Sequence, residues 1–289
     1  MLYFVLQALI DTFFRKAGRS LVIRFFSDPT TEKTPRNPVF ISGVDSAIFF
    51  AKRLIEKMKI CGLQKLSLLD FPGNLAATVF TAGCNLRCKF CHNASLVTGT
   101  NTPKEIPNDY FFDFLKKRRG LIDGICLTGG EPLLQPDTED FLRAVKELGF
   151  KVKLDTNGCF PERLDNLLKK GLVDYAAMDV KNSPLKYSET CGVAFDVTEQ
   201  VKHSADILAA SGIDYELRTT VADELHSVTD ILLLAKWIGG AKKYFIQNFR
   251  ISDDIIGDGM SPCSLEKLEK MKKAAEPYFE TVQLRGIDE

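Results

Sequence analysis

The sequence has no excess charge of either sign and no sign of a membrane anchor. Lysine and arginine number 38, as do aspartate and glutamate, so the formal net charge is zero. A neutral chain lacks the global basic field that attracts nucleic acid. The apolar start, residues 1–14, is interrupted by Gln7 and Asp11, is shorter than the ~20 residues of a membrane span, and lacks the features of a secretory signal. We therefore expect neither a nucleic-acid nor a membrane partner.

The sequence also lacks a second cysteine cluster. Of the eight cysteines, three lie in one loop and the others occur singly, at Cys61, Cys126, Cys159, Cys191 and Cys263. In a chain of this length, this pattern indicates a reducing compartment, so we expect a cytoplasmic protein without disulfides. The scattered cysteines are expected to be mainly buried, unreactive thiols. They offer no further ferredoxin-type cluster site.

Residues 1–57 contain none of the motifs described below. They are rich in phenylalanine, and Pro29, Pro35 and Pro38 indicate a linker near their middle. Three interpretations stay open: a translated region upstream of a native start at Met58, a poorly ordered extension, or an amphipathic docking helix. We therefore divide the chain into an N-terminal extension, 1–57, and one domain, 58–289.

The strongest chemical signal is the loop Cys-Asn-Leu-Arg-Cys-Lys-Phe-Cys-His-Asn, which runs from Cys84 to Asn93. Iron-sulfur cubanes usually take four thiolates, so a C-x3-C-x2-C loop leaves one iron open for chemistry unless a distant cysteine completes the set. A dithiol pair of Cys88 and Cys91 would have no use for Cys84. A zinc site would need a fourth ligand, and His92 is poorly placed beside Cys91. We favour the iron-sulfur cluster.

Apolar strand-like runs alternate with helix-like segments after this loop, as in β-α units with a parallel sheet. Strands are expected at 75–80, 124–128, 151–155, 175–180, 215–221 and 243–247, and near 282, with helices at 109–119, 137–148, 161–170, 197–211, 227–238 and 264–276. Six units are too few to close an eight-stranded barrel. The sequence therefore predicts an α/β fold with a partial (β/α)6 barrel, whose ligands gather at the carboxyl ends of the strands.

The cysteine loop, with Phe90 before its third cysteine, resembles that of the radical S-adenosylmethionine (radical SAM) enzymes. The extended match, Leu69–Gly73 together with Cys91-His92-Asn93, resembles the glycyl-radical activating enzymes, most closely the activating protein of anaerobic ribonucleoside-triphosphate reductase. The resemblance covers residues from Met58 to the C-terminus. It also implies the partial barrel.

This resemblance implies a four-iron, four-sulfur (4Fe-4S) cluster on Cys84, Cys88 and Cys91, with SAM bound to the open iron. An electron from the cluster, delivered by a flavodoxin- or ferredoxin-type donor, would cleave SAM to a 5′-deoxyadenosyl radical. That radical would take hydrogen from a glycine of a glycyl-radical protein, which we expect to be anaerobic ribonucleotide reductase.

Gly129, Gly130 and Glu131 follow a predicted strand directly, and two glycines let the backbone approach a ligand closely. A plain βα turn is the alternative. By resemblance, these three residues contact the amino group of SAM. Asn157 lies in an Asp-Thr-Asn-Gly turn that the resemblance also assigns to the SAM site.

Asp155 and Asp179 end two further predicted strands. By resemblance they bind a monovalent cation beside the SAM carboxylate, and Lys181 contacts SAM. Two solvated acids are the alternative. Arg218 lies within an apolar strand and needs a partner, which either the SAM carboxylate or Glu216 would supply.

His203 and His226 lie on or near predicted helices and are expected to be surface or capping residues. The predicted radical chemistry needs no side chain as an acid or base. The sequence therefore predicts a radical SAM activase, because an open barrel mouth suits a protein loop as substrate. Alternatives are an activase of the pyruvate formate-lyase type, a small-molecule radical SAM enzyme, and a non-catalytic iron-sulfur electron carrier. The carrier would not need the Gly-Gly-Glu motif.

Overall fold

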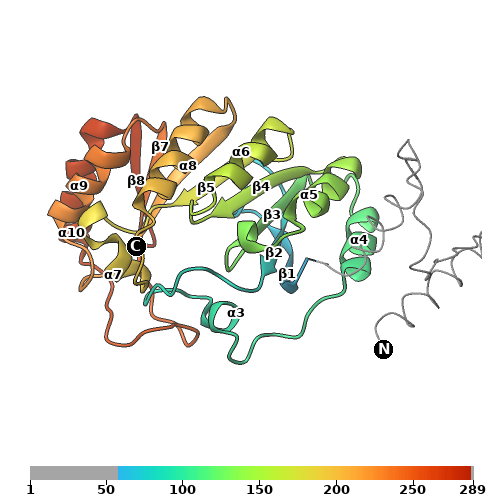
Figure 1. Cartoon of the computed structure of the whole chain (residues 1–289), viewed down its shortest axis with the longest axis horizontal. Helices are drawn as coiled ribbons and strands as arrows, with labels where there is room; N and C mark the ends of the chain where they lie inside the picture. Colours follow the sequence, from blue (N-terminus) through green and yellow to red (C-terminus); the bar gives the residue numbers. More distant parts are fainter. Residues whose placement is uncertain (1–57, 288–289) are drawn as a thin grey trace, which may run out of the picture. The chain divides into compact units, whose positions relative to one another are not determined.

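The structure of the chain is a computed structural model that describes residues 58–287 (Figure 1). The predicted extension, 1–57, lies outside the described residues. The division of the chain into an extension and one domain therefore stays a prediction.

One eight-stranded sheet carries the fold, and its strands are neighbours in chain order. The first strand, β1 (Ile60–Ser67), is antiparallel to β2 (Ala76–Thr81). The others run parallel to β2: β3 (Gly124–Gly129), β4 (Lys151–Thr156), β5 (Tyr175–Asp179), β6 (Asp214–Val221), β7 (Lys243–Asn248) and β8 (Thr281–Arg285). Because β1 and β8 end the strand order, the sheet is open, as expected for a partial barrel.

Helices connect the parallel strands and lie along one side of the sheet (Figure 1). They are α4 (Asn108–Lys117), α5 (Thr138–Glu147), α6 (Pro161–Lys169), α8 (Thr198–Ala210), α9 (Val228–Ile238) and α10 (Leu265–Ala275). Ser227 and Asp230 form a capping box at the start of α9. Within the part of the chain that the structure describes, no helix has the length and hydropathy of a membrane span.

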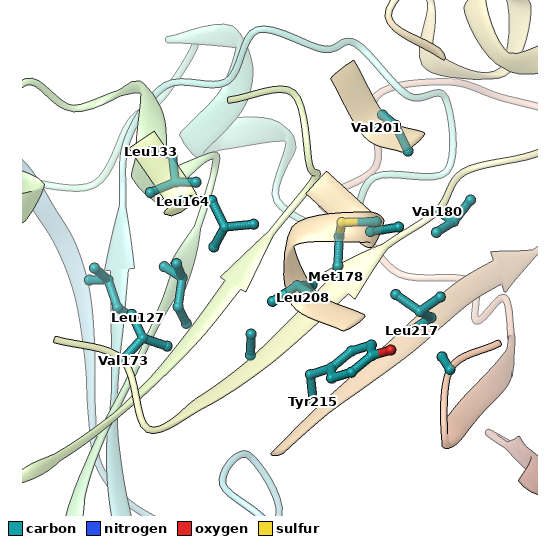
Figure 2. Packing of buried hydrophobic residues seen from close by; sticks show 14 of the residues in the cluster. Leu127, Leu133, Leu164, Val173, Met178, Val180, Val201, Leu208, Tyr215 and Leu217 are labelled. Atoms are coloured by element: carbon teal, nitrogen blue, oxygen red, sulfur yellow. The ribbon is translucent and has the colours of Figure 1, made fainter. Parts of the chain in front are cut away.

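The main hydrophobic core lies between these helices and the sheet. Apolar side chains three or four positions apart give each helix one buried face. Figure 2 shows Leu164 of α6, Leu208 of α8 and Met178 of β5 within this core. Helix packing therefore covers one side of the sheet, and the opposite side is free to carry polar groups.

The predicted helices and strands of the parallel sheet are confirmed, with ends that differ by one or two residues. The sequence did not predict β1, α3 (Ala94–Thr98) or α7 (Tyr187–Cys191). The two helices are single turns, too short to show a helical period. In β1, Gln64 and Lys65 interrupt the apolar pattern, because this strand is an exposed edge of the sheet.

Leu127 tests the contribution of the core, because its side chain is fully buried in β3 (0% exposed). We expect Leu127→Ala to lower the free energy of unfolding by about 2–5 kcal/mol, through lost burial and a cavity. Leu121→Ala, at a side chain 61% exposed, is the matched control and should change it by less than about 0.5 kcal/mol. Urea unfolding followed by circular dichroism measures both, and equal losses would contradict this assignment.

Candidate active site

The carboxyl ends of β3 to β7 open into a cavity of about 250 Å³ that the cysteine loop borders. Every residue predicted for the site, except Glu131, lines this cavity. These residues are Cys84, Cys88, Cys91, Gly129, Gly130, Asp155, Asn157, Asp179, Lys181 and Arg218. Parallel strands end at the same edge of the sheet, so the fold gathers motifs that are far apart in the sequence. Their binding roles stay predictions.

The cysteine loop is held in place by backbone and side-chain hydrogen bonds. Arg87 N donates to Cys191 O (2.8 Å), and Cys91 N donates to Cys88 O (3.0 Å). The side chain of Asn93 donates from Nδ2 to Gly129 O (3.0 Å), which fastens the end of the loop to the end of β3. These hydrogen bonds fix the position of the loop relative to the ends of the strands.

The donor set of this loop fits an iron-sulfur cluster. Its three cysteines, Cys84, Cys88 and Cys91, face the same cavity, and all are free thiols. Burial, together with the negative charge of the nearby Glu131, raises the pKa of Cys84 to about 12, although Lys181 acts in the opposite direction. In the described residues, no three His, Cys, Asp or Glu side chains are arranged around a single ion. A cluster instead holds each thiolate on a separate iron, so its ligands need a wider spacing.

Close contacts with neighbouring backbone leave no room for a side chain at Gly129 and Gly130. Gly129 has a φ of 119°, and a Cβ atom there would collide with the backbone of Thr81. A Cβ atom on Gly130 would collide with the carbonyl of Gly83 in the turn that leads into the cysteine loop. The two glycines therefore let β3 end close against the segment after β2, and they also line the cavity.

Glu131 is buried and does not line the cavity. Its Oε1 accepts hydrogen bonds from Leu133 N (2.9 Å) and Thr156 Oγ1 (2.8 Å), and its Oε2 accepts one from Asn157 N (2.7 Å). Asn157 in turn donates from Nδ2 to Asn85 Oδ1 (2.8 Å) in the cysteine loop. Burial raises the pKa of Glu131 to about 7, although these three donors favour the ionised form. The carboxylate thus positions the turn after β4.

An ion-pair network forms the floor of the cavity. Arg218 Nε donates to Asp179 Oδ1 (2.8 Å), and its guanidinium lies 3.4 Å from Asp155 Oδ2. Lys181 Nζ lies 3.2 Å from Asp179 Oδ2, and Lys153 Nζ pairs with Asp155 Oδ1. Burial alone would raise the pKa of Asp179, but Arg218 and Lys181 hold it below its ordinary value. The alternative of two solvated acids is therefore wrong.

Glu216 is not the main partner of Arg218. The closest oxygen–nitrogen distance between them is 3.9 Å, whereas Arg285 approaches the same carboxylate at 3.0 Å. Tyr175 also donates to Glu216 from its hydroxyl (3.0 Å). Arg218 is thus paired with the two aspartates at the cavity floor.

The expectation that His226 is a surface or capping residue is wrong, because it is only 1% exposed. Its Nδ1 accepts from Ala222 N (3.2 Å), which leaves Nε2 to donate to Lys181 O (2.8 Å). Burial lowers its pKa, so it stays neutral. His226 therefore positions the backbone of Lys181, and no sequence motif marks this role.

Lys153 was also missed, although the sequence does carry a signal for it. Residues 153 and 155 are two apart in a strand, so their side chains point to the same side of the sheet. A charged residue at 153, between the apolar Val152 and Leu154, marks the polar side of β4.

Comparisons with known proteins agree with this geometry. The family profile of the radical SAM superfamily matches residues 78–238. A protein of Methanocaldococcus jannaschii that carries the provisional name glycyl-radical enzyme activating enzyme is 34% identical over 243 residues, which cover 80% of this chain and 98% of that protein. The pyruvate formate-lyase-activating enzyme of Clostridium pasteurianum is 31% identical over 43% of this chain and 52% of that enzyme, about half its length.

Among solved structures, Streptococcus suis SuiB bound to S-adenosylmethionine has a TM-score of 0.52 and 14% identity to this chain. The match covers 98% of this chain and 61% of SuiB. This likeness concerns the fold alone.

The raised pKa of Glu131 predicts a pH-dependent stability. The folded protein holds this proton up to about pH 7, whereas an unfolded glutamate releases it near the ordinary pKa of 4.5. The contribution is therefore complete below pH 4.5 and is lost as the pH rises to about 7, on the order of 3 kcal/mol in all. We expect the difference in unfolding free energy between the wild type and Glu131→Gln to shrink over this range.

Urea unfolding at several pH values measures this difference. Glu139→Gln is the control, because the pKa of Glu139 is lowered by its hydrogen bond to Lys170. A difference between the wild type and Glu131→Gln that grows with pH would contradict the assignment.

Proposed function

The chain belongs to the radical SAM superfamily and is homologous to glycyl-radical enzyme activating enzymes, and on this premise we propose that it cleaves SAM to generate a glycyl radical on a partner protein. One observation carries the proposal. The three cysteines of one loop face the same cavity as the polar carboxyl ends of the strands. An electron carrier has no need for this second set of groups, and they support an enzyme that binds a polar cofactor.

The residues of the loop fit a 4Fe-4S cluster on Cys84, Cys88 and Cys91. When bound, it would supply one electron to the sulfonium of SAM, which yields methionine and a 5′-deoxyadenosyl radical. Transfer of a hydrogen atom from a glycine Cα to this radical gives 5′-deoxyadenosine and leaves the glycyl radical on the partner. No protein side chain needs to move a proton.

The protein contributes binding and orientation of SAM. We assign Gly129, Gly130 and Asn157 to its polar groups, because all three line the cavity beside the cysteine loop. Arg218 and Lys181 bring positive charge that suits the SAM carboxylate. Glu131 would act through the Asn157 turn, since its carboxylate is turned away from the cavity and fully hydrogen-bonded.

We propose anaerobic ribonucleotide reductase as the partner, supported by the resemblance of Leu69–Gly73 and of Cys91-His92-Asn93. Pyruvate formate-lyase is the second candidate, favoured by the similarity to its activating enzymes. A flavodoxin- or ferredoxin-type donor and a cytoplasmic location complete the proposal.

The cleavage reaction is tested after anaerobic reconstitution with iron and sulfide, followed by reduction. We expect 5′-deoxyadenosine to form from SAM with the wild type, and at least about a hundredfold less with Cys88→Ala, because the cluster loses a ligand. Cys61→Ala, at a cysteine of β1 outside the cavity, is the matched control and should keep full activity. A reduced cluster that never cleaves SAM would favour the electron-carrier alternative.

The partner is tested by electron paramagnetic resonance with candidate proteins from the same cells. We expect a glycyl-radical signal on anaerobic ribonucleotide reductase only when this protein, SAM and a reductant are all present. Replacing the radical-bearing glycine of the partner by alanine should abolish the signal. A signal on pyruvate formate-lyase instead would reassign the partner within the same activity.

A further inference from the structure

The two aspartates at the floor of the cavity are already paired with cationic side chains of the protein. All four oxygens of Asp155 and Asp179 have a cationic partner: Lys153 and Arg218 for Asp155, and Arg218 and Lys181 for Asp179. A monovalent cation between the two aspartates would need these oxygens as ligands. The donor set is therefore occupied by the protein's own cations.

Lys153 supplies one of the cations that pair with Asp155. Its side chain is only 2% exposed, lies on the same side of β4 as Asp155, and does not line the cavity. Its Nζ pairs with Asp155 Oδ1 and lies 3.7 Å from Cys126 Sγ, a thiol whose pKa is raised by burial and which therefore stays neutral. A buried ammonium needs a carboxylate partner, so Asp155 is committed to it.

The charges at the floor can be counted. Lys153, Lys181 and Arg218 give three positive charges against two on Asp155 and Asp179, an excess of one. A ligand carboxylate would make the floor neutral. Without Lys153 the floor would be neutral before the ligand binds and would carry one negative charge afterwards, which an added monovalent cation would offset. In this buried setting a net charge is costly.

We propose that the Lys153 ammonium takes the place of a bound monovalent cation, so that the cavity floor binds the carboxylate of an amino-acid ligand without K⁺ or Na⁺. The cation expected from the family resemblance does not fit Asp155 and Asp179 in this chain. Lys153 is a positioning residue that acts through Asp155 and Arg218. Only the identity of the ligand, SAM, rests on the proposed function.

The test compares SAM binding to the reconstituted protein in potassium chloride and in choline chloride of equal concentration, by anaerobic calorimetry. We expect the wild-type dissociation constant to agree within about twofold in the two salts. For Lys153→Met we expect about tenfold weaker binding in choline and recovery in potassium, the size of one charge-assisted contact. Lys151→Met, at an exposed lysine of the same strand, should behave as the wild type.

A double variant separates charge from packing. Lys153→Met combined with Asp155→Asn restores the excess of one positive charge, from Lys181 and Arg218 against Asp179. We expect its SAM binding to lose the dependence on potassium that Lys153→Met shows alone. Damage to the fold would instead persist in the double variant, and that result would overturn the proposal.

Thallium(I), a nuclear magnetic resonance probe for potassium sites, tests the cation site without SAM. We expect no bound thallium on the wild type. Bound thallium that potassium displaces and that Asp155→Asn removes would overturn the proposal, as would a tenfold gain of wild-type SAM affinity in potassium. Failure of SAM to bind in either salt would contradict the proposed function, while the thallium result would still decide the role of Lys153.

Discussion

The geometry of the cavity depends on one buried carboxylate, that of Glu131. It joins two segments that are far apart in the sequence: the turn from Glu131 to Leu133 that follows β3, and Thr156 and Asn157 at the end of β4. The backbone of Glu131 also donates to Gly83 O (2.8 Å) in the approach to the cysteine loop. Because a buried carboxylate is costly unless its oxygens accept hydrogen bonds, the three donors have to stay in place.

Asn157 links the Glu131 carboxylate to the cysteine loop. Its backbone is held by Glu131, and its side chain donates to Asn85, next to Cys84. At the other end of the loop, Asn93 is fastened to the carbonyl of Gly129. The loop is thus held at both ends by the same two strand ends that line the cavity. A ligand that spans the loop and the strands would meet groups already placed for it.

The two sides of the sheet carry different kinds of side chain. The side under the helices is apolar and supplies the stability of the fold, as the cluster of Leu164, Leu208 and Met178 shows (Figure 2). The opposite side carries the ion pairs of Asp155, Asp179 and Arg218. Buried ion pairs contribute little net stability, since desolvation offsets their attraction. The ion pairs at the strand ends therefore determine the charge of the cavity floor more than the stability of the fold.

The sequence by itself determined the parallel α/β fold and the position of its helices and strands, because apolar periodicity and glycine helix ends are local signals. It also marked the cysteine loop, whose ligands are close in sequence, and the strand-end motifs, since parallel strands bring their ends together. Edge strand β1 was not predicted, because its apolar pattern is broken by polar residues at an exposed edge.

Only the tertiary structure decided which side chains pair at the cavity. Arg218 could have paired mainly with Glu216 of its own strand, and the alignment of β4, β5 and β6 brought it to Asp155 and Asp179. Glu131 turned away from the cavity, and His226 became buried behind Lys181. These pairings join residues more than twenty positions apart, and the choice among them depends on distances of a few ångströms. Local sequence patterns carry no information on such distances.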